Sequence, residues 1–244
     1  MSARLKELLR SRVPPSVRRG IRQRLQRFAH PAWLHAFHPA RPLSTQWGFD
    51  RGTPLDRYYI EAFLEEHRAD VRGHGLEVKD RTYLDRFGSG LTRVDVLDID
   101  ASNARATLVA DLATADALPA NEFDCIVLTQ TLQFVFDVAG AIRHLHRILR
   151  PGGVLLATVP SITMLDPPLQ HQEYWRFTLP SCRRLFGAEF GQDRIDVRAY
   201  GNMITARGFL AGMACEDLSA RQLSAHDPIF PLIVSVRAVK RPAG

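Results

Sequence analysis

The chain has 244 residues, of which 45% are hydrophobic and 24% charged, and its formal net charge at pH 7 is +6. This size and composition fit one α/β domain with an additional segment. Cys125, Cys182 and Cys215 form no CxxC pair, which argues against a disulfide framework or a thiolate zinc site. No apolar run approaches the roughly 18 residues of a spanning helix, and the basic N-terminus lacks the apolar core of a secretory signal. We therefore expect a cytoplasmic protein.

Positive charge is concentrated at the start of the sequence. Residues 1–27 contain nine Arg or Lys side chains, opposed by Glu7 alone. The pattern predicts two helical pieces within residues 1–28, broken at residues 13–15. The second piece has one apolar stripe between arginines, formed by Val17, Ile21, Leu25 and Phe28. Such a stripe fits packing on the domain, a solvated tail, or peripheral contact with a membrane or a protein. No nucleic-acid motif accompanies it, so a nucleic-acid partner is not expected.

The remaining sequence divides at residue 54. Residues 29–54 are rich in Pro, His and aromatic residues without periodicity, which predicts an extended linker. Residues 55–67 have the pattern of a helix. We predict a basic helical leader with its linker over residues 1–54, and one domain over residues 55–244.

Within that domain, short apolar runs alternate with turn signals. Strands are expected at residues 76–78, 94–99, 106–109, 123–128, 154–159 and, at or near the sheet edge, 232–239. A helix over residues 138–149 ends at Pro151-Gly152-Gly153 and leads into the strand at 154. This order predicts a Rossmann-like, open and mostly parallel sheet with helices on both faces.

Three phrases resemble the class I S-adenosylmethionine-dependent methyltransferases, in particular bacterial, type-11-like members. LRPGGVLLATVP at residues 149–160 is the most specific of them, and VADLATADALPANEFD at 109–124 precedes it. EYWRFTLPSCRRLF at 173–186 is similar to a stretch of members that act on sugars or cell-surface glycans. The resemblance covers roughly residues 71–200 and implies S-adenosylmethionine as the cofactor.

Acidic residues follow the expected strands, where an open parallel sheet binds its ligand. Asp98 lies about 20 residues after Glu77, the usual interval for an acid that accepts ribose hydroxyls, and Asp100 is a possible substitute. The resemblance aligns Asp111 with the acid that meets the adenine amino group. It places Leu112 beside the adenine, as a backbone donor or apolar cover. Turn or helix capping remains an alternative for Asp98, Asp100 and Asp111.

The loop after the first strand departs from the family. Glu77 matches the family's acid, but Lys79, Arg81 and Tyr83 stand where glycines are expected. These side chains should crowd a methionine moiety, because glycines permit close approach and positive φ. Gly88 and Gly90 are interpreted as the turn into the second strand. Either the loop takes another path and Lys79 or Arg81 pairs with the cofactor carboxylate, or the site has lost its cofactor.

The acceptor side is less defined. Gln130, with Thr131 and Gln133, follows the fourth strand and can face the cleft. Residues 161–174 form an expected lid, in which His171 is the first candidate for a general base because imidazole titrates near neutral pH. A surface histidine is the alternative. The lid also contains Asp166, Glu173 and Tyr174. Trp175 and Phe177, just after it, are expected to form a structural aromatic clasp, with Arg176 as a tie between the lid and a carboxylate.

No metal site is expected, and His144 and His146 should point in different directions on their helix. The leading hypothesis is an O-methyltransferase that acts on a saccharide or another small-molecule hydroxyl in glycan metabolism. The alternative is a catalytically inactive methyltransferase-like binding or scaffolding protein.

Overall fold

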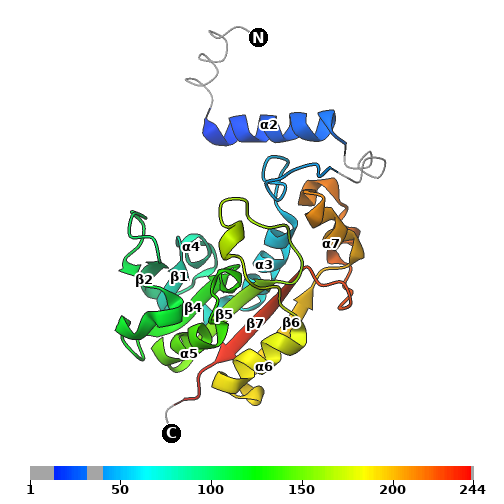
Figure 1. Ribbon diagram of the computed structural model, residues 1–244. Helices are drawn as coiled ribbons and strands as arrows, with labels where there is room; N and C mark the ends of the chain where they lie inside the picture. Colours follow the sequence, from blue (N-terminus) through cyan, green and yellow to red (C-terminus); the bar gives the residue numbers. More distant parts are fainter. Residues whose placement is uncertain (1–13, 32–40, 243–244) are drawn as a thin grey trace. The chain divides into compact units, whose positions relative to one another are not determined.

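A seven-stranded sheet organises the structure (Figure 1), a computed structural model that describes residues 14–31 and 41–242. The strand order is β3-β2-β1-β4-β5-β7-β6. Strands β1 to β5 pair in parallel, whereas β7 is antiparallel to both β5 and β6. The strands are β1 Gly73–Val78, β2 Leu91–Asp98, β3 Leu108–Val109, β4 Phe123–Thr129, β5 Leu149–Pro160, β6 Ile195–Tyr200 and β7 Ile233–Val239. The predicted open, mostly parallel sheet is confirmed.

Helices cover both faces of this sheet. Apolar side chains of α5 and α6 share one buried cluster with Val197 of β6 and Val236 of β7. The neighbouring Arg198 and Arg237 point to the other face, where they pair with Glu66 and Asp70. Helix α4 also packs on that second face. The helices are α2 Pro15–Ala29, α3 Leu55–Glu66, α4 Thr82–Phe87, α5 Val138–Ile148, α6 Leu179–Phe190, α7 Met203–Leu210 and α8 Ala220–Ser224.

The chain divides into two compact units. One contains residues 1–58 and 203–225, and the other contains residues 59–202 and 226–244. The sheet lies in the second unit, and α2, α7 and α8 lie in the first. The boundary expected at residue 54 stays a prediction, and the first of the two expected helical pieces lies outside the described residues.

The described part of the expected linker, residues 41–54, folds into turns instead of an extended segment. Arg51 is buried and forms a two-pronged ion pair with Asp217, with nitrogen–oxygen distances of 3.0 and 2.9 Å. Ser44 accepts a hydrogen bond from the backbone of Gln46 at 2.9 Å. A buried guanidinium needs such a partner, so this pair holds the turns in one conformation.

Candidate active site at the carboxyl edge of the sheet

The ends of β1, β2 and β4 meet at one edge of the sheet. β1 lies between β2 and β4, and β4 continues to β5, so the strand order reverses direction at β1 and β4. Lys79 extends the ladder of β1 by donating to the carbonyl of Leu97 at 2.8 Å, and Gln130 extends β4 by donating to Thr158 at 2.8 Å. Open α/β sheets bind ligands at such a reversal, beyond the carboxyl ends of their strands.

Both residues at this reversal have left-handed backbones. The φ angle is 76° at Lys79 and 48° at Gln130. A side chain with a Cβ atom rarely adopts positive φ, and such residues gather at functional sites. Lys79 occupies the first position where the resemblance expects glycine. The lysine therefore adopts the sign of φ for which that glycine is normally required.

Asp98, at the end of β2, is oriented by its own loop. One carboxylate oxygen accepts from the backbone of Asp100 at 3.0 Å, and the other accepts from the side-chain amide of Asn103 at 2.7 Å. The same amide donates to the carbonyl of Lys79 at 2.8 Å, which joins the ends of β1 and β2. Each carboxylate oxygen has a second lone pair, so Asp98 keeps acceptor capacity for a ligand hydroxyl.

Asp100 lies nearby, but its side chain is exposed and binds within its own turn. Its carboxylate accepts from the backbone of Ser102 at 2.8 Å, and hydrogen bonding by Ser102 holds its pKa below the ordinary value. Asp111 is also exposed, and it caps the short helix η3 (Leu112–Ala117) by accepting from Ala113 at 2.9 Å. Asp111 thus acts as a helix cap, as in the alternative given for it. Leu112 is buried in the main apolar cluster.

Glu77 is buried beneath the loop and binds the start of α4. Its carboxylate accepts from the backbones of Tyr83 at 3.1 Å and Leu84 at 2.8 Å. Burial raises the pKa of Glu77 to about 7, and the two backbone donors only partly oppose this. Glu77 therefore shapes the loop through the backbone of α4.

The crowding expected from the loop side chains is relieved in the structure. Tyr83 is buried against Phe87 in α4, with ring centroids 6.2 Å apart, because the chain turns into a helix directly after Arg81. Arg81 pairs with Asp85 at 2.7 Å. The expectation that all three side chains crowd the methionine moiety is wrong for Tyr83, and Lys79 is left as the candidate cation at this edge.

Three polar side chains at the ends of β4 and β5 carry buried atoms that have no hydrogen-bond partner among the described residues. They are Gln130 Nε2, Gln133 Oε1 and Thr158 Oγ1. Buried polar groups are nearly always paired, so an orphaned group calls for an explanation such as a ligand. Gln130 was predicted here and Gln133 was a candidate, but Thr158 lies inside an apolar run and gave no signal in the sequence.

The segment after β5 is anchored beside this edge. The backbones of Tyr174 and Trp175 donate to the carbonyl of Gln133 at 2.8 and 3.3 Å. Trp175 Nε1 donates to the carbonyls of Val135 and Phe136 at 3.1 and 3.2 Å. The ring centroid of Phe136 lies 5.3 Å from that of Tyr174 and 6.1 Å from that of Trp175. All three side chains are exposed to solvent in part. We call these three residues the aromatic group.

Charged residues brace the same segment. Arg176 pairs with the buried Glu173 at 2.8 Å, as expected for a tie to a carboxylate, and Glu173 accepts from the backbone of Asp166 at 2.8 Å. Burial and the neighbouring Glu173 raise the pKa of Asp166, whereas the charge of Lys79 lowers it. His171 lies in the short helix η5 (Gln170–Gln172) and is exposed.

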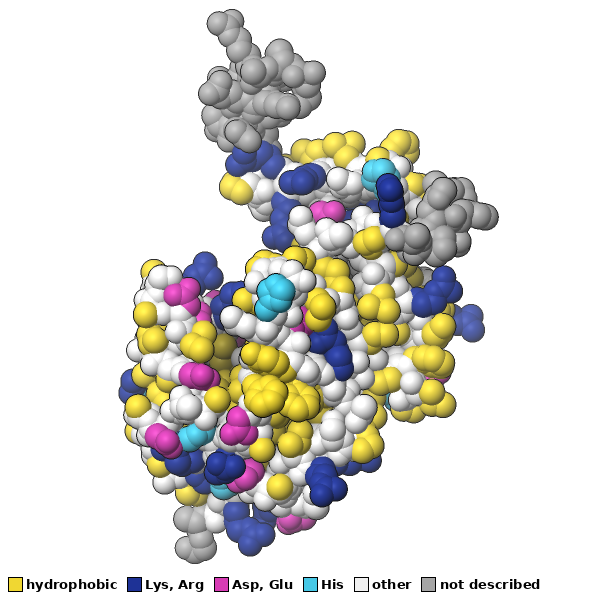
Figure 2. Space-filling model, in the orientation of Figure 1, with side chains coloured by type: hydrophobic (Ala, Val, Ile, Leu, Met, Phe, Trp, Pro, Cys, Tyr) yellow, Lys and Arg dark blue, Asp and Glu magenta, His cyan; other side chains and the backbone are white. Residues whose placement is uncertain are grey.

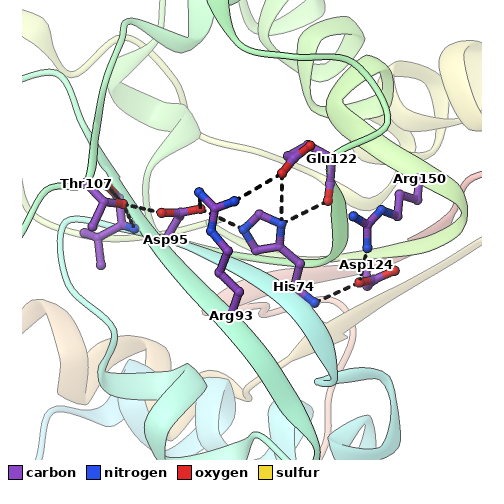
Figure 3. A network of polar contacts seen from close by, with 8 residues as sticks. His74, Arg93, Asp95, Thr107, Glu122, Asp124 and Arg150 are labelled. Atoms are coloured by element: carbon purple, nitrogen blue, oxygen red, sulfur yellow. Dashed lines mark hydrogen bonds and ion pairs between the residues drawn. The ribbon is translucent and has the colours of Figure 1, made fainter.

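A second polar network lies at the opposite end of β1 (Figure 3). His74 is buried, and its ring lies 2.7 Å from Asp95 and 3.1 Å from the carbonyl of Glu122. Thr107 and Arg93 bind Asp95 at 2.7 and 3.0 Å. Because His74 is the second residue of β1 and Lys79 follows the end of that strand, this network stabilises the sheet away from the candidate site. It was not predicted from the sequence.

No group of three metal-binding side chains occurs within residues 14–31 and 41–242. His144 lies 3.7 Å from Asp116 and His146 packs edge-on to Phe190, so the two imidazoles point apart as expected. An open pocket of about 380 Å³ lies away from the β1–β4 reversal, beside β6, and is lined by Glu66, Leu179, Arg198, Ala199, Tyr200, His226 and Pro228.

Comparisons with known proteins agree with this geometry. Residues 75–157 match the family model described as a methyltransferase domain. The ubiquinone/menaquinone biosynthesis C-methyltransferase UbiE of Yersinia pestis (strain Pestoides F) is 30% identical over 118 residues, which are 46% of this chain and 47% of that protein. The Klebsiella pneumoniae (strain 342) protein of the same name is 29% identical over 119 residues, with the same shares. The chain thus spans about half the length of these relatives.

Solved structures share the fold. The [4+2]-cyclase SpnF superposes with a TM-score of 0.53 and 13% identity, over 79% of this chain and 84% of that one. A phosphoethanolamine N-methyltransferase from Haemonchus contortus, solved with phosphomonomethylethanolamine and S-adenosylhomocysteine, gives a TM-score of 0.50 at 15% identity, over 76% of this chain and 53% of that one. At such identities the likeness establishes the fold alone, and one fold supports different reactions.

Proposed function

We propose that this chain, which carries a domain of the class I S-adenosylmethionine-dependent methyltransferase family, binds S-adenosylmethionine at the carboxyl edge of its sheet and methylates a small molecule. The observation that supports this most is the meeting of Asp98, Lys79 and Gln130 where the strand order reverses. The buried, unpaired amide nitrogen of Gln130 at this edge fits a ligand that brings a polar group.

Each of these residues has a role in the proposal. When bound, S-adenosylmethionine supplies an electrophilic methyl group on a sulfonium. Asp98 accepts hydrogen bonds from the ribose hydroxyls, with Asp100 as the substitute, and Asp111 and Leu112 bind the adenine. Lys79 pairs with the cofactor carboxylate and so offsets the missing glycine contacts. Glu77 holds the loop, and Gln130 donates its unpaired amide into the cleft.

For the acceptor, we propose a hydroxyl group of a saccharide or another small molecule. His171 is then the general base: it would take the hydroxyl proton while the methyl group passes to the oxygen, with its bond to the sulfonium sulfur breaking and a neutral thioether leaving. Its exposure on the segment after β5, which the aromatic group anchors, is compatible with contact to an acceptor that enters from solvent. Aromatic faces also suit the apolar faces of sugar rings.

A ring carbon is the second candidate acceptor, because the curated relatives are named as C-methyltransferases of ubiquinone and menaquinone biosynthesis. The aromatic group of Phe136, Tyr174 and Trp175 supports this option as well, since offset stacking favours a planar acceptor. In that case the ring carbon would take the methyl group as its bond to sulfur breaks, and His171 or water would then accept the proton of that carbon.

The experiment incubates the full chain with methyl-deuterated S-adenosylmethionine and two acceptor panels, saccharides and hydroxylated aromatic rings. Mass spectrometry locates the deuterated methyl group on oxygen or on carbon. Product from saccharides that falls at least about 100-fold in His171→Asn supports the first proposal, and carbon-methylated rings support the second. If neither panel is methylated and the folded chain does not bind the cofactor, the inactive binding or scaffolding alternative is favoured. A cytoplasmic location, and a protein or membrane partner for residues 1–28, also remain proposals.

A further inference from the structure

Helix α2 presents its apolar stripe to solvent. Val17, Ile21, Leu25 and Phe28 have exposed fractions between 50% and 87%, and α2 has no buried residue. Figure 2 shows hydrophobic side chains exposed along this helix beside arginines. An amphipathic helix of a globular protein normally turns its apolar stripe inward, so α2 has the opposite arrangement.

The polar side of α2 makes the contacts with its own unit. Gln23 Nε2 donates to the carbonyl of Phe49 at 3.0 Å, and the Arg27 guanidinium donates to the carbonyl of Arg51. Arg51, fixed by its ion pair with Asp217, donates to the carbonyl of His30 at 3.0 Å, just past the end of the helix. At 3.6 residues per turn, Gln23 lies roughly opposite the middle of the stripe. The helix is therefore held with its apolar side outward.

Positive charge borders the exposed stripe. Helix α2 contains five arginines and no acidic residue, and the exposed arginines nearest to the stripe are Arg22 on one border and Arg24 on the other. Arg18 also lies beside the stripe, but its side chain is half-buried and its Nε is shielded from solvent. Long basic side chains at such borders extend to lipid headgroups while the apolar residues enter the acyl boundary. In a pair formed by two copies of α2, the same arginines would face one another and repel.

We propose that α2 is an interfacial anchor that lies on an anionic lipid surface, with Val17, Ile21, Leu25 and Phe28 inserted among the lipids. This assignment goes beyond the methyltransferase function and does not depend on it. An anionic lipid surface matches both features of the helix, since its acyl region takes up the apolar stripe and its headgroups neutralise the basic borders. No described helix is long and apolar enough to cross a membrane.

The test is flotation of the full chain with two kinds of vesicle, pure phosphatidylcholine and a mixture of phosphatidylcholine with phosphatidylglycerol. We expect the chain to float with the mixed vesicles and to be released by high salt. Ile21→Asp should lower partitioning of the chain onto the mixed vesicles at least about tenfold. Leu25→Ser is a milder second variant and should lower this partitioning about threefold. Arg22→Gln and Arg24→Gln, which replace exposed arginines, should each lower it about fivefold, on the mixed vesicles only.

Ile229→Asp is the matched control, because Ile229 is 79% exposed and lies far from α2 in the sequence. It should float like the original chain. Light scattering accompanies the flotation. The proposal is overturned if Ile21→Asp floats as well as Ile229→Asp, or if neutral and anionic vesicles bind equally. It is also overturned if no vesicle binds and Ile21→Asp dissolves a dimer, which would identify a second copy as the cover of the stripe.

Discussion

The side-chain amide of Asn103 donates to Asp98 at 2.7 Å and thereby fixes the carboxylate proposed to hold the cofactor ribose. The same nitrogen binds the carbonyl of Lys79, so one side chain ties the ends of β1 and β2 together. Neither bond uses up the acceptor capacity of Asp98. Asn103 is therefore a positioning residue.

Asn103→Ala should weaken S-adenosylmethionine binding about fivefold to tenfold, because Asp98 loses its orienting donor and the two strand ends lose their link. Calorimetric titration measures the change. The control is Gln172→Ala, which replaces an exposed amide in the segment after β5. Asn202→Ala is not suitable as a control, because Asn202 is buried. Equal affinity of Asn103→Ala and the original chain would remove Asn103 from the site.

Lys79→Gly separates the effect of the positive φ at this position from the proposed effect of the lysine charge on cofactor binding. Glycine adopts the φ of 76° without strain, so the free energy of unfolding should stay equal or rise by about 1 kcal/mol. Cofactor affinity should nevertheless fall about tenfold, since the ammonium proposed to pair with the cofactor carboxylate is lost. Lys79→Arg, which keeps the charge, should retain more of the affinity. If Lys79→Gly bound the cofactor more tightly, the lysine would be an obstacle instead of a ligand.

Glu77 should make stability depend on pH. Its pKa is about 7 in the folded chain, so the folded state binds the proton more tightly than the unfolded state does. The resulting stabilisation is complete below the unfolded pKa, near 4.5, and is lost as the pH rises through about 7. Denaturant unfolding from pH 5 to 8 should show a decline of up to about 3 kcal/mol that Glu77→Gln lacks. Parallel curves for the two proteins would contradict the assignment.

His74 should matter for stability and not for cofactor binding. His74→Phe leaves Asp95 buried without its imidazole partner, so the free energy of unfolding should fall by about 2 kcal/mol or more. Although burial raises it, hydrogen bonds from Thr107 and His74 hold the pKa of Asp95 below its ordinary value. Urea unfolding measures the stability, and a His74→Phe variant that remains folded should bind S-adenosylmethionine like the original chain.

The sheet was predictable where its strands are buried on both faces. Residues 123–128 and 154–159 form nearly continuous apolar runs, and they are the central strands β4 and β5. β6 was missed because Asp196 and Arg198 interrupt its pattern. Those charges lie on an edge strand, where Arg198 pairs with Asp196 and Glu66. The run at residues 232–239 was correctly placed near the edge, since β7 lies one strand inside it.

The candidate site was predictable only in part. Asp98 was predictable from its place at the end of a largely apolar strand. The left-handed backbone of Lys79 depends on the ladder with Leu97, and the unpaired hydroxyl of Thr158 depends on packing between neighbouring strands. Tyr83 was expected in the loop, but α4 begins immediately before it and turns its ring into the core. Such properties arise from three-dimensional neighbours and leave no pattern in the sequence.

The most direct measurement is calorimetric titration of the full chain with S-adenosylmethionine and S-adenosylhomocysteine, beside Asp98→Asn and the matched Asp100→Asn. We predict one site per chain with micromolar affinity. Asp98→Asn should weaken it at least about tenfold, because the amide lacks the charge that strengthens hydrogen bonds from the ribose. Asp100→Asn should change it little. The absence of binding to the folded chain at millimolar ligand would contradict a working cofactor site and favour a binding or scaffolding role.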